Sequence, residues 1–135
     1  MLRTTRQQEI QLFNAQAATG VSSAVNVSDY RHVVVAVTAP LNATLTFKFM
    51  GAVRSTSPTF SSAQSTTNVW DYVGVYDLNN NDPIVGDTGV ALNNDTAANN
   101  TRQYLINTDH LTWFALEVSA YTYGSLSAWL MASND

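Results

Sequence analysis

Histidine, serine and aspartate are the residue types in this chain that could carry out hydrolytic chemistry. His32 follows Asp29 by three residues, and His110 follows Asp109 directly. Combined with one of the many serines, either pair supplies the groups of a Ser-His-Asp site. The sequence contains no Gly-x-Ser-x-Gly elbow and no glycine-rich segment suited to an oxyanion hole. Because both histidines lie near the start of an expected strand, we expect structural roles for them and no enzymatic activity.

A carboxylate beside aromatic residues could instead line a sugar-binding site. Glu117 is expected in the middle of a strand, with Trp113 and Trp129 nearby in the sequence. It would contribute to a sugar site beside these tryptophans or, as we favour, act as a charge that discourages unwanted pairing at a sheet edge.

A calcium loop is the metal site that the sequence suggests most directly. The segment DLNNND at 77–82 spaces oxygen ligands like the start of such a loop. Its sixth position is Asp82 where an EF-hand needs glycine, and its twelfth is Thr88 where it needs glutamate. With Asp87 beside it, an irregular calcium site is the alternative. An Asn/Asp turn is the favoured interpretation, and no metal or cofactor is predicted.

An aromatic patch is the predicted interaction surface. Its members lie in the C-terminal part of the sequence: Trp113, Tyr121, Tyr123 and Trp129. Aromatic enrichment is typical of subunit interfaces, although a carbohydrate-binding surface would use the same residues. Arg3 and Arg6 make the N-terminal tip mildly basic and are the other predicted contacts.

The composition indicates one globular domain with an unusually uncharged surface. The chain has 135 residues, of which 45% are hydrophobic and 12% are charged, about half the usual charged share. Such a surface has little like-charge repulsion to keep proteins apart. We interpret it as a surface that neighbouring subunits cover; a secreted domain with a polar, uncharged coat is the alternative.

Charge and patterning also argue against several partners. The net charge is −4 and the six basic residues are scattered, so no basic face for direct nucleic-acid binding is expected. The chain has no cysteine, which fits assembly in a reducing cytoplasm. It shows neither the apolar stretch of a signal peptide nor a run of roughly 20 apolar residues, so no membrane partner is predicted.

Short alternating segments predict an all-β fold. In residues 44–50, Leu45, Phe47 and Phe49 alternate with polar residues, as in a strand with one buried face. About eight such strands, with turn-rich segments between them and no helical periodicity, predict an antiparallel β-sandwich of jelly-roll-like type. Residues 1–19 are expected to form an extended N-terminal arm, and residues 20–135 the sandwich domain.

The middle of the chain gives two further expectations. Residues 55–68 form a Ser/Thr-rich loop that is expected to be too polar for the core. Residues 70–78 are expected to form one strand, in which regular alternation would place Trp70, Tyr72 and Tyr76 on the same face.

Two parts of the sequence resemble each other at a spacing of 81 residues. Residues 37–51 and residues 118–132 each contain an alternating segment, a short turn and a second alternating segment. We interpret each copy as a β-hairpin. Because a hairpin cannot bury its apolar face alone, two similar hairpins facing each other would form the layers of a sandwich.

Several motifs resemble a known group of proteins. They are NVWDYVGVYDL (68–78), DPIVGDTG (82–89), RQY (102–104), NTDHLTW (107–113) and VSAYTYGSL (118–126). Together they resemble small β-sandwich structural proteins encoded among the virion genes of tailed bacteriophages and prophages. The resemblance covers most of residues 20–132 and concerns turns, strand starts and core aromatics, so no active site is carried over.

The resemblance implies a non-enzymatic protein of the phage virion, assembled in the host cytoplasm. The role it favours is a capsid decoration or cement protein, usually a trimer that bridges subunits of the major capsid protein. A tail, neck or baseplate component and a glycan-binding β-sandwich module are the alternatives.

Overall fold

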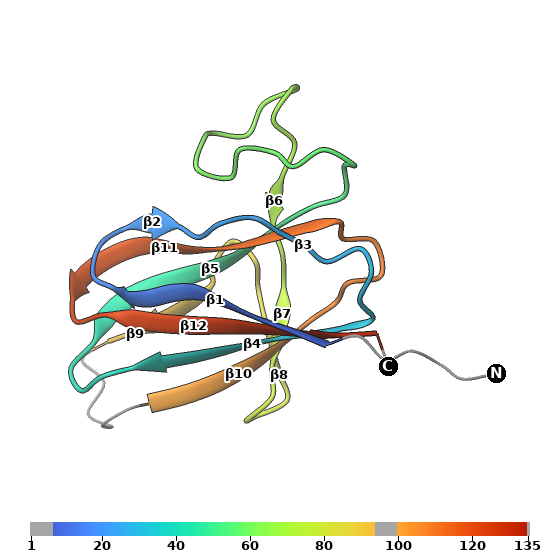
Figure 1. The fold of residues 1–135 in the computed structure, drawn as a ribbon. Helices are drawn as coiled ribbons and strands as arrows, with labels where there is room; N and C mark the ends of the chain where they lie inside the picture. Colours follow the sequence, from blue (N-terminus) through green and yellow to red (C-terminus); the bar gives the residue numbers. More distant parts are fainter. Residues whose placement is uncertain (1–6, 94–99, 135) are drawn as a thin grey trace.

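Two antiparallel β-sheets pack face to face in this chain, which confirms the predicted β-sandwich (Figure 1). The structure is a computed structural model, and it describes residues 7–93 and 100–134. Every regular element within these residues is a strand. Twelve strands are present instead of about eight because six of them contain only two or three residues.

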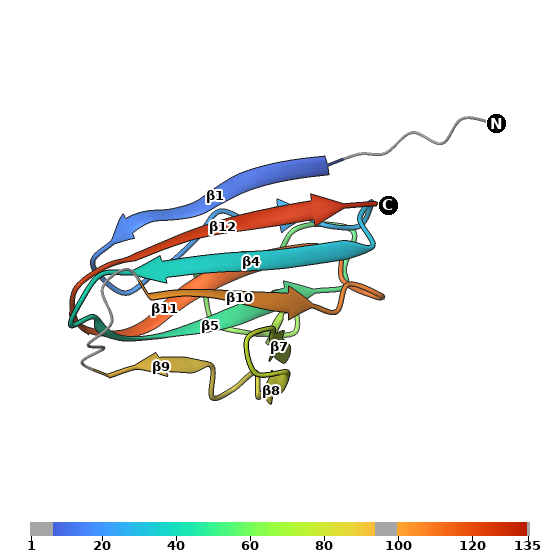
Figure 2. The same ribbon diagram turned by 90° about the horizontal axis from the view of Figure 1, so that it is seen from below.

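Sheet A contains four long strands and a short hairpin, and Figure 2 shows the long strands side by side. In spatial order its strands are β1 (Gln7–Gln16), β12 (Leu126–Ser133), β4 (His32–Ala39), β10 (Asn100–Ile106), β7 (Val75–Asp77) and β8 (Asp82–Ile84).

Sheet B is built around two long strands, β11 (Trp113–Tyr123) and β5 (Thr44–Ala52). Short strands extend it on both sides. They are β2 (Gly20–Val21) and β3 (Val25–Asn26) beside β11, and β6 (Asp71–Tyr72) and β9 (Val90–Leu92) beside β5.

Part of the segment expected to form an N-terminal arm lies within sheet A. Residues 7–16 form β1, which pairs with β12 in regular register from Gln7 opposite Ser133 to Gln11 opposite Trp129. The register then shifts twice before the strand ends at Gln16. Residues 1–6 lie outside the described residues.

The core fills the space between the two sheets and uses the alternating residues that the sequence predicts. Leu45, Phe47 and Phe49 on β5 are at most 3% exposed. The rings of Phe47 and Phe49 contact the ring of Tyr104 on β10 of the opposite sheet, at centroid distances of 5.8 and 5.2 Å, respectively. At about 1.5–3 kcal/mol for each large side chain removed from water, this stripe and its counterparts on β4, β11 and β12 hold the sheets together.

The two similar segments are not hairpins, which corrects the sequence prediction. Strands β4 and β5 belong to different sheets, as do β11 and β12, so each segment forms an arch that crosses from one sheet to the other. Each arch pairs with the other arch: β4 lies beside β12 and β5 beside β11. A hairpin and an arch both bury one face of two alternating strands, so alternation alone does not distinguish them.

The interlocked arches are related by an internal twofold relationship that extends to the register. Val37 pairs with Ala128, and their counterparts 81 residues away, Val118 and Phe47, also pair with each other. The same correspondence holds over six consecutive residue pairs, from Trp113 to Val118 on β11 and their equivalents on β4. It ends at the bulge after Val118.

Turns and entry loops share this internal symmetry. Arg31 N donates to the Ser133 carbonyl oxygen at 3.0 Å, and the equivalent Thr112 N donates to the Ala52 carbonyl oxygen at 2.8 Å. At the other end of the arches, Gly124 (φ +91°) lies directly against its equivalent residue, Ala43. The two turns therefore meet where the internal axis passes.

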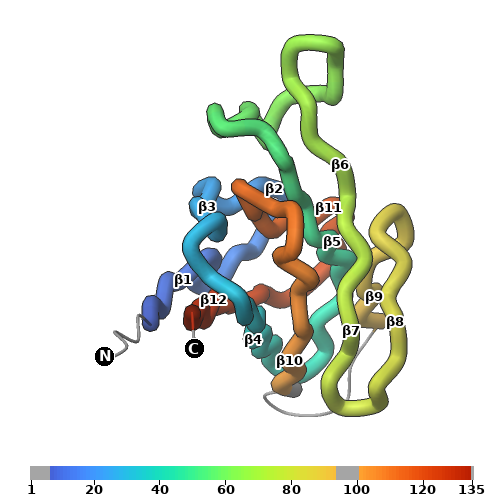
Figure 3. Tube along the Cα trace, turned by 90° about the vertical axis from the view of Figure 1, so that its right-hand side faces the viewer, coloured from blue at the N-terminus to red at the C-terminus, as the bar shows by residue number. Residues whose placement is uncertain are grey.

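A second, smaller hydrophobic cluster lies on the outer face of sheet B, beneath the loop from 53 to 70. Its buried members are Met50, Ala52, Phe60 and Ala115. The loop stands out from the sandwich (Figures 1 and 3), but Phe60 at its base is only 5% exposed. The expectation that residues 55–68 would stay out of the core is therefore wrong for Phe60, whereas the rest of the segment is exposed or half-buried. Most residues of this segment are serine or threonine, so its average polarity does not indicate that one aromatic residue is buried.

The path of the chain between residues 70 and 78 differs from the single strand that the sequence predicts. Trp70 and Tyr72 pack against the second cluster on sheet B, whereas Tyr76 belongs to β7 of sheet A. The residues between β6 and β7 carry the chain from one sheet to the other. The three aromatic residues therefore do not share a face, because the single strand assumed for this segment is two strands in different sheets.

Candidate interaction surface

Residues predicted to form one aromatic patch are distributed over both sheets. Trp113, Tyr121 and Tyr123 lie on β11 in sheet B, whereas Trp129 lies on β12 in sheet A. Trp113 and Tyr121 are eight residues apart along one strand, a separation of roughly 26 Å at the usual rise per residue. The structure therefore does not bring the four residues together. Arg3 and Arg6 lie outside the described residues.

Two of the aromatic residues on β11 have partners within the fold. Trp113 is half-buried against the second cluster, and its Nε1 donates to the Ser55 carbonyl oxygen at 3.3 Å. Tyr121 packs against the main core, and its hydroxyl donates to the Gly124 carbonyl oxygen at 2.8 Å. Tyr123, in contrast, is 60% exposed at the end of β11.

An apolar row crosses the outer face of sheet A. The strand registers place five side chains next to one another on adjacent strands: Met131, Val34, Leu105, Tyr76 and Pro83. Met131, Leu105 and Tyr76 are 43%, 37% and 53% exposed. These five residues are called the sheet A row below. Sequence reasoning missed the row because its members come from five strands that the chain order does not place side by side.

Residues around the sheet A row are nearly all uncharged. Trp129 is two residues before Met131 on β12, so the two side chains are on the same face of the sheet. It lies between Gln11 on β1 and Ala36 on β4. Glu9 is opposite Met131 on β1 and is the charged residue at that end of the row. The outer face of sheet A is therefore a broad surface of glutamine, serine, threonine and apolar side chains.

Sheet B carries a cluster of polar groups where sheet A carries apolar ones. The Tyr72 hydroxyl donates to Glu117 Oε1 at 2.7 Å, and Lys48 Nζ lies 4.7 Å from the centre of the Tyr72 ring. Burial, followed by the hydrogen bond to Glu117, raises the pKa of Tyr72 to about 12. Glu117 lies between β2 and β5, so its interpretation as an edge charge is wrong. It anchors β6 to the sheet through Tyr72.

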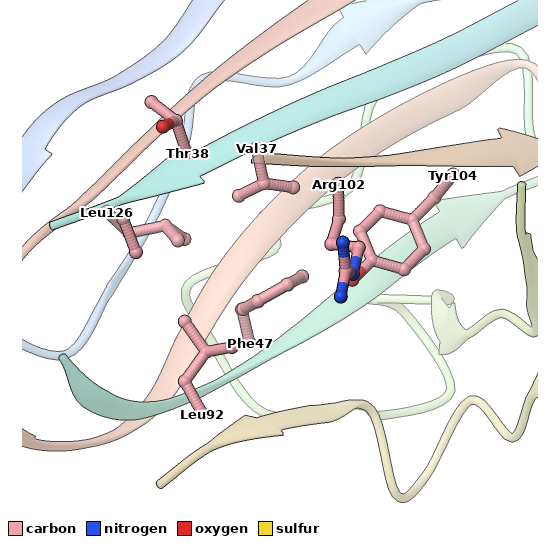
Figure 4. Close-up of a pocket in the computed structure, with 8 residues that line it drawn as sticks. Val37, Thr38, Phe47, Leu92, Arg102, Tyr104 and Leu126 are labelled. Carbon is pink, nitrogen blue, oxygen red and sulfur yellow. The ribbon is translucent and has the colours of Figure 1, made fainter. Parts of the chain in front are cut away.

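One gap between the sheets is too small to hold a ligand. Figure 4 shows the gap that Arg102 and Tyr104 of β10 line, with Phe47 and Leu92 across from them. The space holds about 10 Å³, no more than one water molecule. Burial raises the pKa of Tyr104, and the charge of Asp77 acts in the same direction. A larger groove, lined in part by Arg31, His32 and Asp109, opens beside Leu105 and Tyr76.

The sequence motifs considered for catalysis and metal binding adopt turn and strand-end conformations. His32 is the exposed first residue of β4, and His110 is exposed in the turn before β11. Asp77 Oδ1 accepts a hydrogen bond from Asn79 N at 2.9 Å, which makes the 77–82 segment an Asn/Asp turn, as favoured. Within residues 7–93 and 100–134, no three His, Asp or Glu side chains lie close enough to hold a metal ion.

A search for membrane-spanning helices gives a negative result for the described part of the chain. No helix there is long and apolar enough to cross a bilayer.

Comparison with solved structures identifies proteins with the same fold. The SPBc2 prophage-derived protein YomS is similar over 98% of this chain and 97% of its own, with a TM-score of 0.68 and 9% sequence identity. The PBSX exported protein XepA is similar over 98% of this chain, with a TM-score of 0.70 and 12% identity. This chain corresponds to 39% of the XepA chain. At these identities the similarity establishes the fold alone.

Sequence comparisons add no family assignment. No protein-family model matches the sequence, and no curated protein sequence matches it.

Proposed function

We propose that this chain is a structural, non-enzymatic protein of a tailed-bacteriophage virion, a capsid decoration protein that self-associates and bridges subunits of the major capsid protein. The observation that carries the proposal is the uncharged outer face of sheet A with its apolar row. Exposed apolar side chains aligned on adjacent strands are typical of a surface that another protein covers.

Two further observations support a structural role in a phage particle. YomS and XepA, which share the fold, are described as prophage-derived and as a PBSX exported protein, respectively. The motif resemblance points to the same genomic context. In addition, Glu117, a residue considered for a sugar site, accepts a hydrogen bond from the Tyr72 hydroxyl, which suits a structural role.

Cryo-electron microscopy of particles from the source phage tests this proposal directly. Density for the chain on the capsid exterior is the expected result. Density in the tail, neck or baseplate would contradict the decoration role and favour the alternative virion role. Absence from purified particles, checked by mass spectrometry of their proteins, would contradict a virion role altogether.

The residues that were expected to form a glycan-binding site, the alternative function, lie on different sheets. That hypothesis placed a sugar beside Trp113, Trp129 and Tyr123. Because Trp129 is on the opposite sheet from the other two, no single sugar ring could contact all three. We therefore propose no glycan site at these residues.

A further inference from the structure

We propose that a second copy of this chain packs on the outer face of sheet A, with the same face of both copies in contact across a twofold axis. The inference rests on the self-association contained in the proposed function and names the surface responsible. The two arches are equivalent in register, so the outer face of sheet B can be compared residue by residue with that of sheet A. The comparison shows which side chains cover an apolar centre at this position.

Equivalent apolar pairs lie on the outer faces of the two sheets. On sheet B, Met50 and Ala115 are cross-strand neighbours on β5 and β11. Their equivalents 81 residues away on sheet A are Met131 and Val34, which are cross-strand neighbours on β12 and β4. The two sheets thus present the same kind of apolar centre at the same place in the strand register.

Among the described residues, a covering segment lies over only one of these two centres. Met50 and Ala115 are both 0% exposed, because Phe60 from the 53–70 loop and the nearby Trp70 and Tyr72 cover them. Met131 is 43% exposed, although it occupies the equivalent position. Sheet A therefore has the apolar centre without the aromatic cover that completes it on sheet B.

A second copy supplies that aromatic cover through a twofold axis that lies in the plane of the contact and runs parallel to the strands. With the axis between Val34 and Leu105, Val34 faces the second copy's Leu105, and Met131 faces the second copy's Tyr76. Contacts between a thioether and an aromatic ring are favourable, and they reproduce the environment of Met50. The row is therefore complementary to itself when reversed, as a twofold interface requires.

Charge and size also favour a second copy as the occupant. The row itself is uncharged, and the charged residues beside it are of both signs: Glu9 opposite Met131, and Arg31 and Asp109 in the groove beside Leu105 and Tyr76. Two copies therefore meet here with less repulsion than their shared net charge of −4 alone would produce. At about 4.8 Å between strands and 3.3 Å per residue, the six strands present roughly 600 Å² of flat area, to which the relief of the side chains adds. A standard interface uses about 800 Å² of accessible surface per partner, so the face approaches the size of such a contact.

Val53 is the matched control position for substitutions in the row. It is 60% exposed and lies in the 53–70 loop, which follows β5 of sheet B. It is therefore apolar, exposed and outside the proposed contact.

Sedimentation equilibrium of the full chain and of Leu105→Glu tests the proposal. Wild type is expected to associate in multiples of two, whereas a carboxylate buried without a partner in the contact should weaken dimerisation by roughly tenfold or more. Val53→Glu should associate like wild type. A wild-type monomer, a trimer, or an assembly that Leu105→Glu leaves intact would overturn the proposal.

Cross-linking gives a second test that does not depend on a destabilising substitution. The chain has no cysteine, so Met131→Cys/Tyr76→Cys introduces the only thiols. Within one copy these positions are three strands apart, roughly 14 Å, whereas across the proposed axis they face each other. A short bis-maleimide should give a covalent dimer, and Met131→Cys/Val53→Cys should not. Equal dimer yields from the two variants would overturn the proposal.

These tests separate failure of the contact from failure of the proposed function. A chain found on the capsid exterior that nevertheless stays monomeric in solution retains the decoration role and loses the sheet A contact. A chain absent from particles that still forms cross-linked dimers retains the contact and loses the virion role. A different virion protein bound to sheet A, seen in the particle density, would also overturn the second-copy proposal.

Discussion

Replacement of Gly124 by alanine should destabilise the sandwich substantially, because this position is where the two arches meet. Gly124 has φ +91°, a conformation that residues with a Cβ adopt only with strain. A Cβ built there would lie 2.9 Å from the Cα of Ala43 and 3.1 Å from its Cβ. Because the nearer of these two atoms belongs to the backbone of the opposite turn, no side-chain rotation can relieve the clash.

The magnitude follows from adding the two effects. A non-glycine residue in the left-handed region costs of order 1–2 kcal/mol, and forcing an extra methyl group into a packed site costs about 1–3 kcal/mol. We expect the free energy of unfolding to decrease by about 2–5 kcal/mol. For a chain of 135 residues this corresponds to a Tm lower by about 7–18 °C.

Chemical and thermal denaturation followed by circular dichroism measure this change, with Gly20→Ala as the control. A Cβ at Gly20 would meet only the flexible amide of Gln16, at 2.9 Å, and Gly20 has no positive φ. Adding Ala43→Gly to Gly124→Ala should restore only part of the lost stability, because it removes the contact with the Ala43 Cβ but leaves both the closer contact with the Ala43 Cα and the backbone strain. A Gly124→Ala variant as stable as Gly20→Ala would refute the close approach of the two turns.

Three further predictions concern the second cluster and its surroundings. Phe60→Ala should lower stability by about 3 kcal/mol and make the 53–70 loop sensitive to limited proteolysis; unchanged cleavage would contradict its anchoring role. Ser22→Ala should cost about 1–3 kcal/mol in urea denaturation, because Ser22 Oγ accepts a buried hydrogen bond from Leu116 N at 2.9 Å; Ser23→Ala is the control. The raised pKa of Tyr72 means that the folded state holds its proton more tightly, so this contribution to stability is complete below pH 10 and is lost between pH 10 and about 12. In alkaline titration by tyrosinate absorbance, Tyr72→Phe should remove one tyrosine from the late phase; loss from an early phase would contradict the assignment.

Alternation made the sandwich predictable, because each long strand buries one face. Leu45, Phe47 and Phe49 point into the core as their spacing indicates. The partner of each strand was not predictable from the same pattern. In β4 and β5, alternation is equally compatible with a hairpin and with an arch, and the choice depends on the turn at Asn42 and on contacts with the distant strands β11 and β12.

The interaction surface was the least predictable part of the molecule for a related reason. Aromatic residues close in sequence, such as Trp113 and Trp129, were expected to be close in space, but the second arch sends them to different sheets. Leu105 and Tyr76 are far apart in the chain, yet they become neighbours because β10 pairs with β7. Long-range pairing creates the row, and single-sequence patterns carry little information about such pairing.

Internal symmetry finally gives a reason why the two outer faces should have different roles. The strands of the arches keep the same register in both sheets, so the core alone would give two similar outer faces. The segment after β5 breaks this similarity by placing Phe60 over Met50. Met131, at the equivalent position, has no such cover from the described residues. Because removing an exposed apolar side chain of this size from water contributes about 1.5–3 kcal/mol, the uncovered face is the one that gains most from association, and the covered face is the one suited to remain in contact with solvent.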